Sequence, residues 1–460
     1  MPGSKLRVGF IGLSGKKGWA IKSHFTVIQN LSDYFEIVAI SNSSMEASCK
    51  TIEELKLPNC KPFGNDYESF AQYDQLDMVV VSVKVTAHYS IIMDLLNFKH
   101  KNSGLCNFKI LLVEWALGNG LQEASNIYEL CNKTNVQSVI SLQGRYSPHM
   151  LLAKKLIDEN RIGKINSIDV TANAGWYGYQ RPYNSPDYLY DIHSGHNMIT
   201  TAFAHTIDSI QYIVGAYVQR LNAMIFNNIK QQEVIGPKNV SMGVFKPKSV
   251  PDHVLFQGSI SNTGNIPISV SFQGGTPTNS FTKNLVINVH GTKGDLKIEG
   301  NAGFPQISNL ALYFCGVPLT SEKGQTDGTS KFGLNDLQYN NKTTLKDQHY
   351  NNQSHNLMDP QLKAGMFFSQ NTHSGKQERE EEHQVVEKYQ LNNYNPVVGN
   401  MMRLYEAILR YYNHDIVYDA QGFATEGFPT FKDAILLHQL IDSVFESNEL
   451  SRTVDPNIHL

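Results

Sequence analysis

The chain has 460 residues, of which 41% are hydrophobic and 18% charged, and its formal net charge at pH 7 is −3. This length allows two domains with substantial cores, and the composition is that of an ordinary globular protein. The weakly acidic balance argues against direct nucleic-acid binding, which normally needs a basic domain or stripe.

The cysteines and the apolar runs give a first expectation for the compartment. The five cysteines are odd in number and show no C-x-x-C spacing, so they fit reduced thiols in the cytosol or the nucleus. No apolar run approaches the length of a membrane span, and the first strand begins too early to leave room for a signal peptide. We therefore expect a soluble protein of the nucleus and cytoplasm.

A short apolar strand near the start of the chain ends in a glycine-rich turn that opens a helix. The turn resembles the pattern G-x-G-x-x-G from Gly12, but Ser14 replaces the second glycine and residues 15–18 read as an insertion. Glycines let the backbone approach a pyrophosphate, and the N-terminus of the following helix stabilises its charge. The segment predicts a nucleotide site of altered form.

The next elements supply the context that such a turn needs. A helix is predicted over 17–31 and a buried strand over 35–40. An acidic residue that binds the adenosine ribose should follow this strand, but the chain has Ser41, Asn42 and Ser43, so a preference for NAD or NADP cannot be inferred. A purely structural turn without a ligand remains an alternative.

Strands and helices then alternate without a break to about residue 145. A short segment lies at 61–63, strands are predicted over 77–83, 108–114 and 136–141, and helices over 87–98 and 121–131. This order predicts a Rossmann domain over residues 1–145. Ligands of such sheets lie beyond the carboxyl ends of the strands, so the walls of the cleft should come from segments 84–88, 114–116 and 143–145.

The pattern changes after Arg145. A helix over 150–160 precedes alternating runs at 165–172, 255–260 and 268–272, and residues 285–299 predict a hairpin. We expect a second, α+β domain over 146–460 with a large, open, mostly antiparallel sheet of a kind that often supports a dimer. Residues 318–387 read as a long polar insertion, and helices return at 395–412 and 430–447.

Several of these segments resemble the glucose-fructose oxidoreductase and inositol dehydrogenase family. The resemblance spans nearly the whole chain, and its markers are residues 8–12, the strand end with His88, and segments 143–148 and 291–296. It implies a Rossmann domain followed by an open-sheet domain, with NAD or NADP as the cofactor.

The residues that carry catalysis in this family are only partly present. Active members have a Glu-Lys-Pro segment whose lysine polarises the reacting group, and here the lysine position holds Trp115. They also place an aspartate four residues before a catalytic histidine, and here the pair is Thr201 and His205. Neither replacement can supply the lost charge, so we expect a pseudo-oxidoreductase without catalytic residues.

Two histidine patterns could indicate a metal, but a simpler interpretation is favoured for both. His205 and Asp208 have the spacing of an ordinary contact along a helix, and His193 with His196 lacks further ligands. No metal is expected.

A closer resemblance points to a regulatory branch of the family that controls galactose and lactose metabolism genes in yeasts. It rests on segments 140–145, 175–179, 290–297 and 423–429. It implies a corepressor that masks the acidic activation domain of a galactose transcription activator. It further implies relief by a galactokinase-like sensor loaded with galactose and ATP, and dimerisation through the second domain.

The expected site combines a nucleotide cradle with large aromatic rings and basic side chains, a composition that suits an acidic, hydrophobic peptide. The three tryptophans should border the cleft, with a rim of Lys16, Lys17, Lys22, Lys84, Arg145 and Arg181. The predicted cofactor-binding residues are Gly12, Leu13, Ser14, Lys17, Gly18, Trp19, Ser41, Val83, Lys84, His88, Glu114, Trp115 and Arg145. The predicted partner-binding residues are Trp19, Lys84, Trp115, Arg145, Trp176 and Tyr177.

Two other functions remain open on the sequence. One is an active NAD(P)-dependent sugar oxidoreductase, against which Trp115 and Thr201 argue. The other is a sugar-binding sensor that needs no dinucleotide.

Overall fold

The computed structural model describes residues 5–16, 18–261, 265–275, 283–319, 395–413 and 427–456. Most of the polar insertion expected over 318–387 lies outside these residues, as do Lys17 and most of segment 423–429. Within the described ranges, no helix is both long and apolar enough to cross a membrane. All five cysteines carry free thiols.

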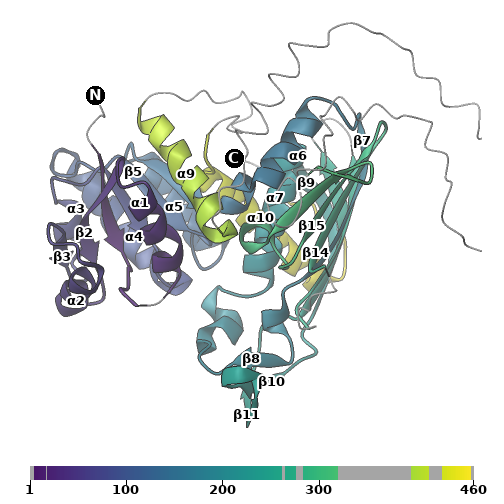
Figure 1. Ribbon diagram of the computed structural model, residues 1–460, viewed down its shortest axis with the longest axis horizontal. Coiled ribbons are helices and arrows are strands. Elements are labelled where there is room, and N and C mark those ends of the chain that lie inside the picture. The colour runs from purple at the N-terminus through teal and green to yellow at the C-terminus, as the bar shows by residue number, and fades with distance from the viewer. Residues whose placement is uncertain are drawn as a thin grey trace, which may run out of the picture. The chain divides into compact units, whose positions relative to one another are not determined.

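The first sheet is parallel throughout and has the strand order β3-β2-β1-β4-β5-β6 (Figure 1). Its strands are nearly continuous apolar runs because helices cover both faces. The predicted Rossmann-type α/β architecture is therefore confirmed. The strands are β1 (Leu6–Ile11), β2 (Phe35–Ser41), β3 (Lys61–Phe63), β4 (Met78–Val81), β5 (Ile110–Glu114) and β6 (Gln137–Ser141).

The crossover helices of this sheet follow the predicted order, with one irregularity at the start. The segment expected as a single helix over 17–31 contains a π-helical turn, η1 (Ile21–Phe25), before α1 (Thr26–Asn30). The wider turn shifts the phase of the helix, so that the polar residues Ser23 and His24 are buried beside Phe25, which the spacing of apolar residues does not predict. The other crossover helices are α2 (Met45–Leu55), α3 (Tyr67–Ala71), α4 (Val85–Lys101) and α5 (Leu121–Asn132).

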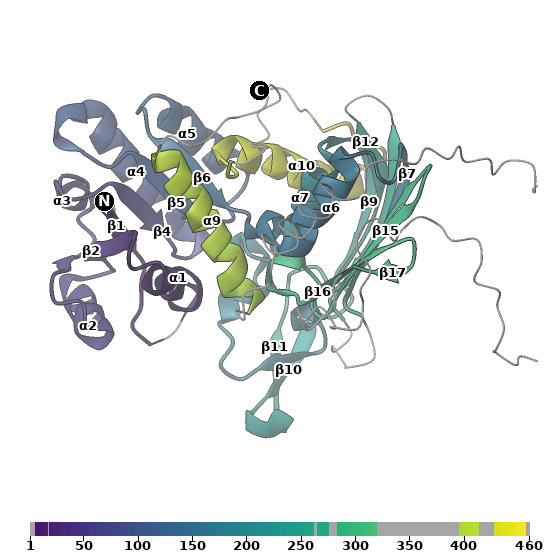
Figure 2. The same ribbon diagram turned by 45° about the horizontal axis from the view of Figure 1, so that its top comes forward.

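A helix from the C-terminal part of the chain completes the core of the first sheet. Helix α9 (Pro396–Tyr412) lies beside η1 and α1 (Figure 2), and Met401, Leu404 and Ile408 are fully buried in the cluster that contains the first strand. Each such side chain contributes roughly 1.5–3 kcal/mol by leaving water. The core around the first sheet is thus built from both ends of the sequence.

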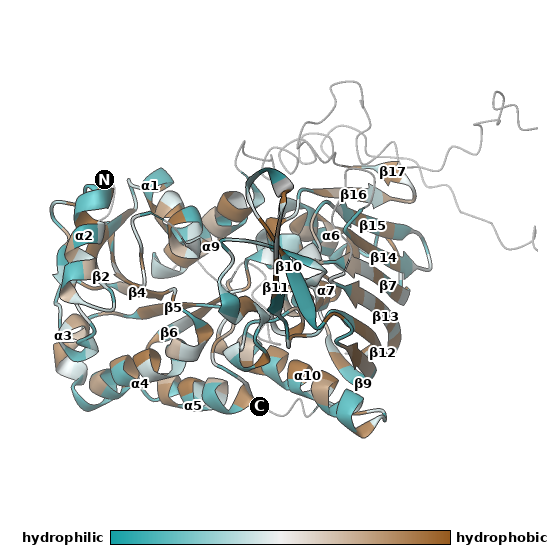
Figure 3. Cartoon of the chain, turned by 90° about the horizontal axis from the view of Figure 1, so that it is seen from below, coloured by the Kyte–Doolittle hydropathy of each residue, from teal (hydrophilic) through white to brown (hydrophobic). Residues whose placement is uncertain are grey.

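The second large sheet has eight strands in the order β17-β16-β15-β14-β7-β13-β12-β9. Only β7 and β13 pair in parallel, which confirms the expected mostly antiparallel sheet. Apolar and polar residues alternate along its strands (Figure 3). The bounds are β7 (Ile165–Asn173), β9 (Tyr217–Phe226), β12 (His253–Ser261), β13 (Ile266–Gln273), β14 (Leu285–Gly291), β15 (Asp295–Gly300), β16 (Leu310–Phe314) and β17 (Val317–Pro318).

Three helices pack on the apolar face of this sheet (Figure 1): α6 (Pro148–Asp158), α7 (Ala204–Val214) and α10 (Phe431–Leu450). Helix α10 also contacts β6 and α5 of the first sheet, so it joins the two sheets. The expected division at residue 145 falls in the short helix η3 (Gln143–Tyr146), between β6 and α6, and it stays a prediction.

A third, small sheet was not expected from the sequence. It consists of β8 (Gln180–Pro182), β10 (Gln231–Ile235) and β11 (Ser241–Pro247), in the order β11-β10-β8. Several short helices lie in the connections throughout the chain: η2 (Ser103–Leu105), η4 (Gly175–Tyr177), η5 (Asp187–Tyr190), η6 (Ile192–Ser194), the π-helical η7 (Ile199–Phe203), η8 (Pro237–Asn239) and η9 (Pro305–Ile307).

Candidate functional site

The glycine turn after β1 has the backbone conformation of a nucleotide cradle. Gly12 has φ +92°, and a Cβ there would overlap the Ser82 carbonyl oxygen and Val83 Cγ1 at the end of β4. Gly18 has φ +111° and open space around its Cα. Both positions therefore need glycine, the first because of close packing and both because of the left-handed φ.

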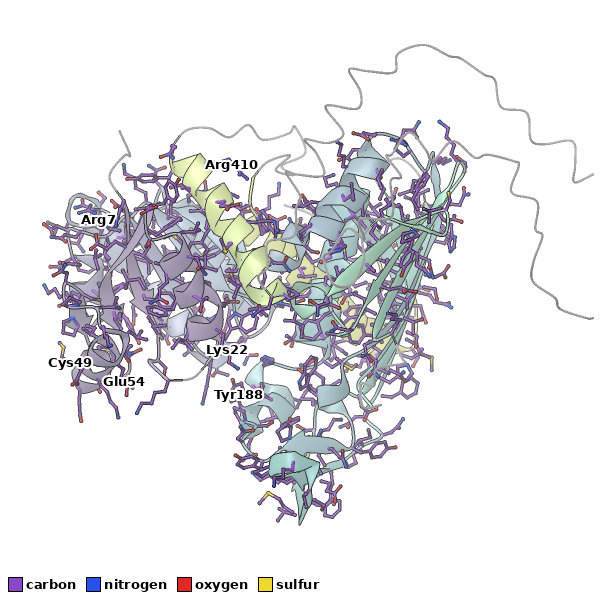
Figure 4. All side chains as sticks on the ribbon, in the orientation of Figure 1. Arg7, Lys22, Cys49, Glu54, Tyr188 and Arg410 are labelled. Atoms are coloured by element: carbon purple, nitrogen blue, oxygen red, sulfur yellow. The ribbon has the colours of Figure 1, made fainter. Side chains whose placement is uncertain are left out.

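The adenosine side of the turn is held by side chains that face inward. Ser41 is buried and donates its hydroxyl to the Gly64 carbonyl oxygen at 2.6 Å, while Asn42 Nδ2 donates to the Leu13 carbonyl oxygen at 2.9 Å. The exposed Lys16 forms an ion pair with Glu54 of α2, with 3.1 Å between Nζ and Oε1. Figure 4 labels Glu54. Asn42 therefore stabilises the backbone of the turn. In other dinucleotide sites the acidic residue after this strand binds the ribose instead.

Glu114 at the end of β5 is the centre of a largely buried hydrogen-bond network. Its Oε1 accepts from Trp19 Nε1 at 2.7 Å and lies 2.5 Å from His24 Nε2, whose Nδ1 lies 2.8 Å from the Tyr405 hydroxyl. The network links the glycine turn, η1, β5 and α9. Trp19 is partly exposed, whereas His24 and Tyr405 are buried, so only one end of the network reaches the surface.

Trp115, which we predicted to occupy the position of the family's catalytic lysine, is a packed side chain. It is 8% exposed, its Nε1 donates to the Thr200 carbonyl oxygen at 2.6 Å, and its ring lies 4.8 Å from that of His438 on α10. The indole thus joins β5 to η7 and α10. It presents no charged donor to a reacting group.

Thr201 and His205, the other pair that we compared with the family's catalytic residues, are packed groups as well. Thr201 is hydrogen-bonded to the Tyr177 hydroxyl and lies 3.2 Å from His196 Nδ1. His205 is buried and stacks on Phe304, and burial lowers its pKa to about 3. His205 Nδ1 has no hydrogen-bond partner among the described residues. A histidine with this pKa is neutral at pH 7 and is a weak proton acceptor.

Arg145 is buried and bound to two carboxylates. Its Nε and Nη2 donate to Asp208 at distances down to 2.5 Å, and Nη1 donates to Asp433 Oδ1 at 2.8 Å. Desolvation opposes the charged guanidinium, but the two carboxylates raise the pKa of Arg145 above its ordinary value. The ion pairs join η3, α7 and the first turn of α10, and they use the donors that were expected to face a cofactor or partner.

The other predicted site residues divide into buried and exposed groups. His88 is fully buried between the carbonyl oxygens of Ala116 and Val83, and burial lowers its pKa. The exposed Lys84 places Nζ 5.0 Å from the ring centre of Tyr188, which Figure 4 labels. Trp176 is 44% exposed and meets Phe304 edge-on.

Tyr177 and Arg181 are buried as well, although both were expected near the cleft surface. Arg181 lies over the ring of Tyr190 and pairs with Asp187. Of the predicted aromatic and basic surface, the side chains that are at least partly exposed are Trp19, Trp176, Lys16, Lys22 and Lys84. The roles predicted for all these residues stay predictions.

The geometry of the turn fits the phosphates of a dinucleotide. The exposed Gly18 lies directly before the first helical residues, Trp19 and Ala20. The first N–H groups of a helix have no intrahelical acceptor and can bind an anion. The position that normally distinguishes NAD from NADP holds the neutral Asn42, which is bonded to the Leu13 backbone and gives no preference for either. Within the described ranges, no group of three or more His, Cys, Asp or Glu side chains could hold a metal ion.

Several site contacts were not predicted from the sequence. Glu54 beside the turn, Tyr405 in the Glu114 network and Asp433 beside Arg145 come from helices that no local motif connects to the site. His24 lies five residues after Trp19 on the same helical segment, and this spacing is the only local signal that could have indicated it.

Two family models match the chain. The model for the oxidoreductase family with an NAD-binding Rossmann fold matches residues 6–142. The model for the C-terminal domain of Gal80p matches residues 148–300.

Two curated proteins are similar to this chain over nearly its whole length. The galactose/lactose metabolism regulatory protein GAL80 of Saccharomyces cerevisiae is 44% identical, with 98% of this chain and 94% of the relative covered. Its counterpart from Kluyveromyces lactis is 45% identical, with 99% and 96% covered.

Solved structures agree with this result. A super-repressor mutant of Gal80p from S. cerevisiae aligns with a TM-score of 0.78 at 42% identity and covers 99% of both chains. A levoglucosan dehydrogenase in complex with NADH and L-sorbose aligns with a TM-score of 0.60 at 17% identity over 98% of this chain and 99% of that one, a likeness of fold alone. The chain belongs to the family of GAL80 galactose/lactose metabolism regulatory proteins.

Proposed function

We propose that this protein is a transcriptional corepressor of galactose and lactose metabolism genes. The similarity to two regulatory proteins at 44–45% identity across almost the entire chain supports this function. A corepressor of this kind acts in the nucleus and is also present in the cytoplasm.

The corepressor would act by masking the acidic activation domain of a galactose transcription activator. Trp19, Lys84 and Trp176 are the predicted partner residues whose side chains are at least partly exposed, and they offer aromatic area and positive charge. Trp115, Arg145 and Tyr177 are buried, so their part in this function is to position that surface. A galactokinase-like sensor carrying galactose and ATP would relieve the masking, and the protein would act as a dimer.

The packing of Trp115 is the observation that most strongly supports a function without catalysis. The side chain donates to the Thr200 backbone and packs on His438, so no ammonium group is available to polarise a hydroxyl or carbonyl group. His205 is a weak base because of its burial, and Thr201 replaces the aspartate that would orient it. Loss of several cooperating groups removes most of the rate enhancement.

The dinucleotide site would serve binding or structure. The backbone N–H groups of Leu13, Ser14, Gly18 and Trp19 would hold the pyrophosphate, as at other helix N-termini. When bound, NAD or NADP would supply negative charge and an aromatic ring.

A titration tests the proposal. Purified full-length protein is titrated with NAD, with NADP and with the activation-domain peptide, and nicotinamide absorbance is then followed with a panel of sugars. We expect binding of the peptide and no change in nicotinamide absorbance. Turnover of any sugar would instead establish an NAD(P)-dependent oxidoreductase, and failure to bind the peptide would refute masking.

A further inference from the structure

The small sheet of β8, β10 and β11 and its connecting residues form an arm, defined here as residues 179–183 and 230–247 (Figure 1). Its base is firmly held. The buried Gln232 donates Nε2 to the carbonyl oxygens of Gly178, at 2.7 Å, and Trp176, at 3.2 Å. The fully buried Lys248 donates Nζ to the Val250 carbonyl oxygen at 2.7 Å and to Asp252 Oδ2 at 3.2 Å.

The arm exposes an unusual amount of apolar surface. It carries six of the fourteen large hydrophobic side chains that are exposed among the described residues: Tyr179, Tyr183, Val240, Met242, Val244 and Phe245. Their exposed fractions lie between 46% and 68%. Single exposed apolar residues are normal, but such a cluster on one short element indicates a contact surface for a partner.

The arm carries four positive side chains, Arg181, Lys230, Lys238 and Lys246, and one negative side chain, Glu233. Its carboxylate Glu233 accepts hydrogen bonds from Ser241 and Gln180, and Lys246 is paired with the neighbouring Asp187. Lys230 and Lys238 are exposed and have no ion-pair partner among the described residues. An apolar patch with unpaired lysines is complementary to a segment that carries both apolar and acidic side chains.

A second copy of the chain fits this surface less well. Identical patches would meet in a symmetric dimer, and the unpaired lysines would then face each other. The free edge of β11 is also unsuited to pairing with another strand, because Gly243 has φ +65° and Pro247 lacks an N–H group. Contacts through side chains are therefore favoured over extension of the sheet.

We propose that the arm is a second docking surface for the acidic activation segment, next to the surface around Trp176. Only two residues separate Trp176 from Tyr179, and Gln232 of β10 donates a hydrogen bond to the Trp176 carbonyl oxygen. A segment bound at Trp176 can therefore also contact the arm. Apolar side chains of the segment pack on Met242 and Phe245, and its carboxylates approach Lys230 and Lys238. This inference rests on the proposed function.

The test measures affinity for a fluorescently labelled activation-domain peptide by anisotropy at two salt concentrations. The arm variants are Phe245→Ser and Lys238→Glu, both at exposed positions where the fold is not expected to change. The matched controls are Leu105→Ser, at a position 60% exposed on η2, and Lys101→Glu, at the exposed end of α4. We expect each arm variant to weaken binding about fivefold or more, as for a buried interface contact, and the controls to bind like the wild type. Lys238→Glu should also reduce the dependence on salt.

The outcomes separate the arm from the proposed function. If the wild type binds the peptide and the arm variants bind within about twofold of their controls, the arm proposal is overturned while masking stands. If the wild type does not bind, both are overturned. If the arm variants instead change the sedimentation of the unliganded protein, the surface belongs to contacts between copies and the proposal is overturned.

Discussion

Three buried histidines should make the protein sensitive to mild acid. His149, His205 and His438 lie on α6, α7 and α10, and burial lowers their pKa values to about 4, 3 and 3. Each ring has one nitrogen without a hydrogen-bond partner among the described residues: His149 Nε2, His205 Nδ1 and His438 Nε2. These three imidazoles are therefore neutral in the folded protein, whereas an unfolded chain would protonate them readily.

The size of the effect follows from the difference between folded and unfolded pKa values. An unfolded histidine has a pKa of about 6.5, so below that pH the unfolded state binds a proton that the folded state does not. The free energy of unfolding therefore decreases as the pH is lowered, until the pKa of the folded state is reached. Between about pH 7.5 and pH 5.5 each residue should lower the free energy of unfolding by about 1.4 kcal/mol, and the three together by about 4 kcal/mol.

Urea unfolding followed by tryptophan fluorescence at the two pH values and constant ionic strength tests this expectation. His205→Gln removes one titrating ring at similar volume, so its stability should depend on pH by about 1.4 kcal/mol less than that of the wild type. His100→Gln, at an exposed position, is the matched control. Comparing variants at the same pH cancels the opposite contribution of Asp208, whose pKa burial raises. A wild-type change below about 1 kcal/mol, or an unaltered pH dependence in His205→Gln, would refute the reasoning.

Three further predictions concern the site. Arg145→Met leaves the buried carboxylates of Asp208 and Asp433 without their cation, and we expect the free energy of unfolding in urea to fall by about 3–5 kcal/mol; an unchanged midpoint would contradict a structural role. Trp115→Ala removes a buried indole and should cost about 3–5 kcal/mol in the same assay, a loss that a merely surface-exposed tryptophan would not show. Gly12→Ala forces a Cβ into a close backbone contact at positive φ, so dinucleotide affinity in a fluorescence titration should fall by about tenfold or more, and wild-type affinity would argue against a cradle at this turn.

The sequence predicted those parts of the fold that have strong local patterns. The continuous apolar runs of β1, β4 and β5 and the glycine at position 12 are local consequences of a parallel sheet and its first turn. The irregular Ser14 was also apparent, but the inward orientation of Asn42 depends on a contact with the Leu13 backbone that no pattern encodes.

The parts that the sequence did not predict depend on contacts between distant residues. Arg145 was expected in the cleft because it follows a strand end, yet its partner Asp433 lies 288 residues away and holds it inside. Strand β10 was missed because its sequence, QQEVI, does not alternate between polar and apolar residues, although its burial does alternate. Strand β11 was missed because nearly all of its residues are exposed. The burial of Trp115 could not be predicted either, because a tryptophan at a strand end can be buried or exposed, depending on its neighbours in the fold.

The position of α9 also has a consequence for how the protein is made. The ribosome releases β1 through β6 long before Pro396–Tyr412, yet Tyr405 completes the network of Glu114 and Leu404 fills the core beneath the first strand. Part of the apolar face of the first sheet and its helices therefore stays uncovered until more than two hundred further residues have been synthesised. A truncated product that ends before α9 would keep this apolar face exposed to water.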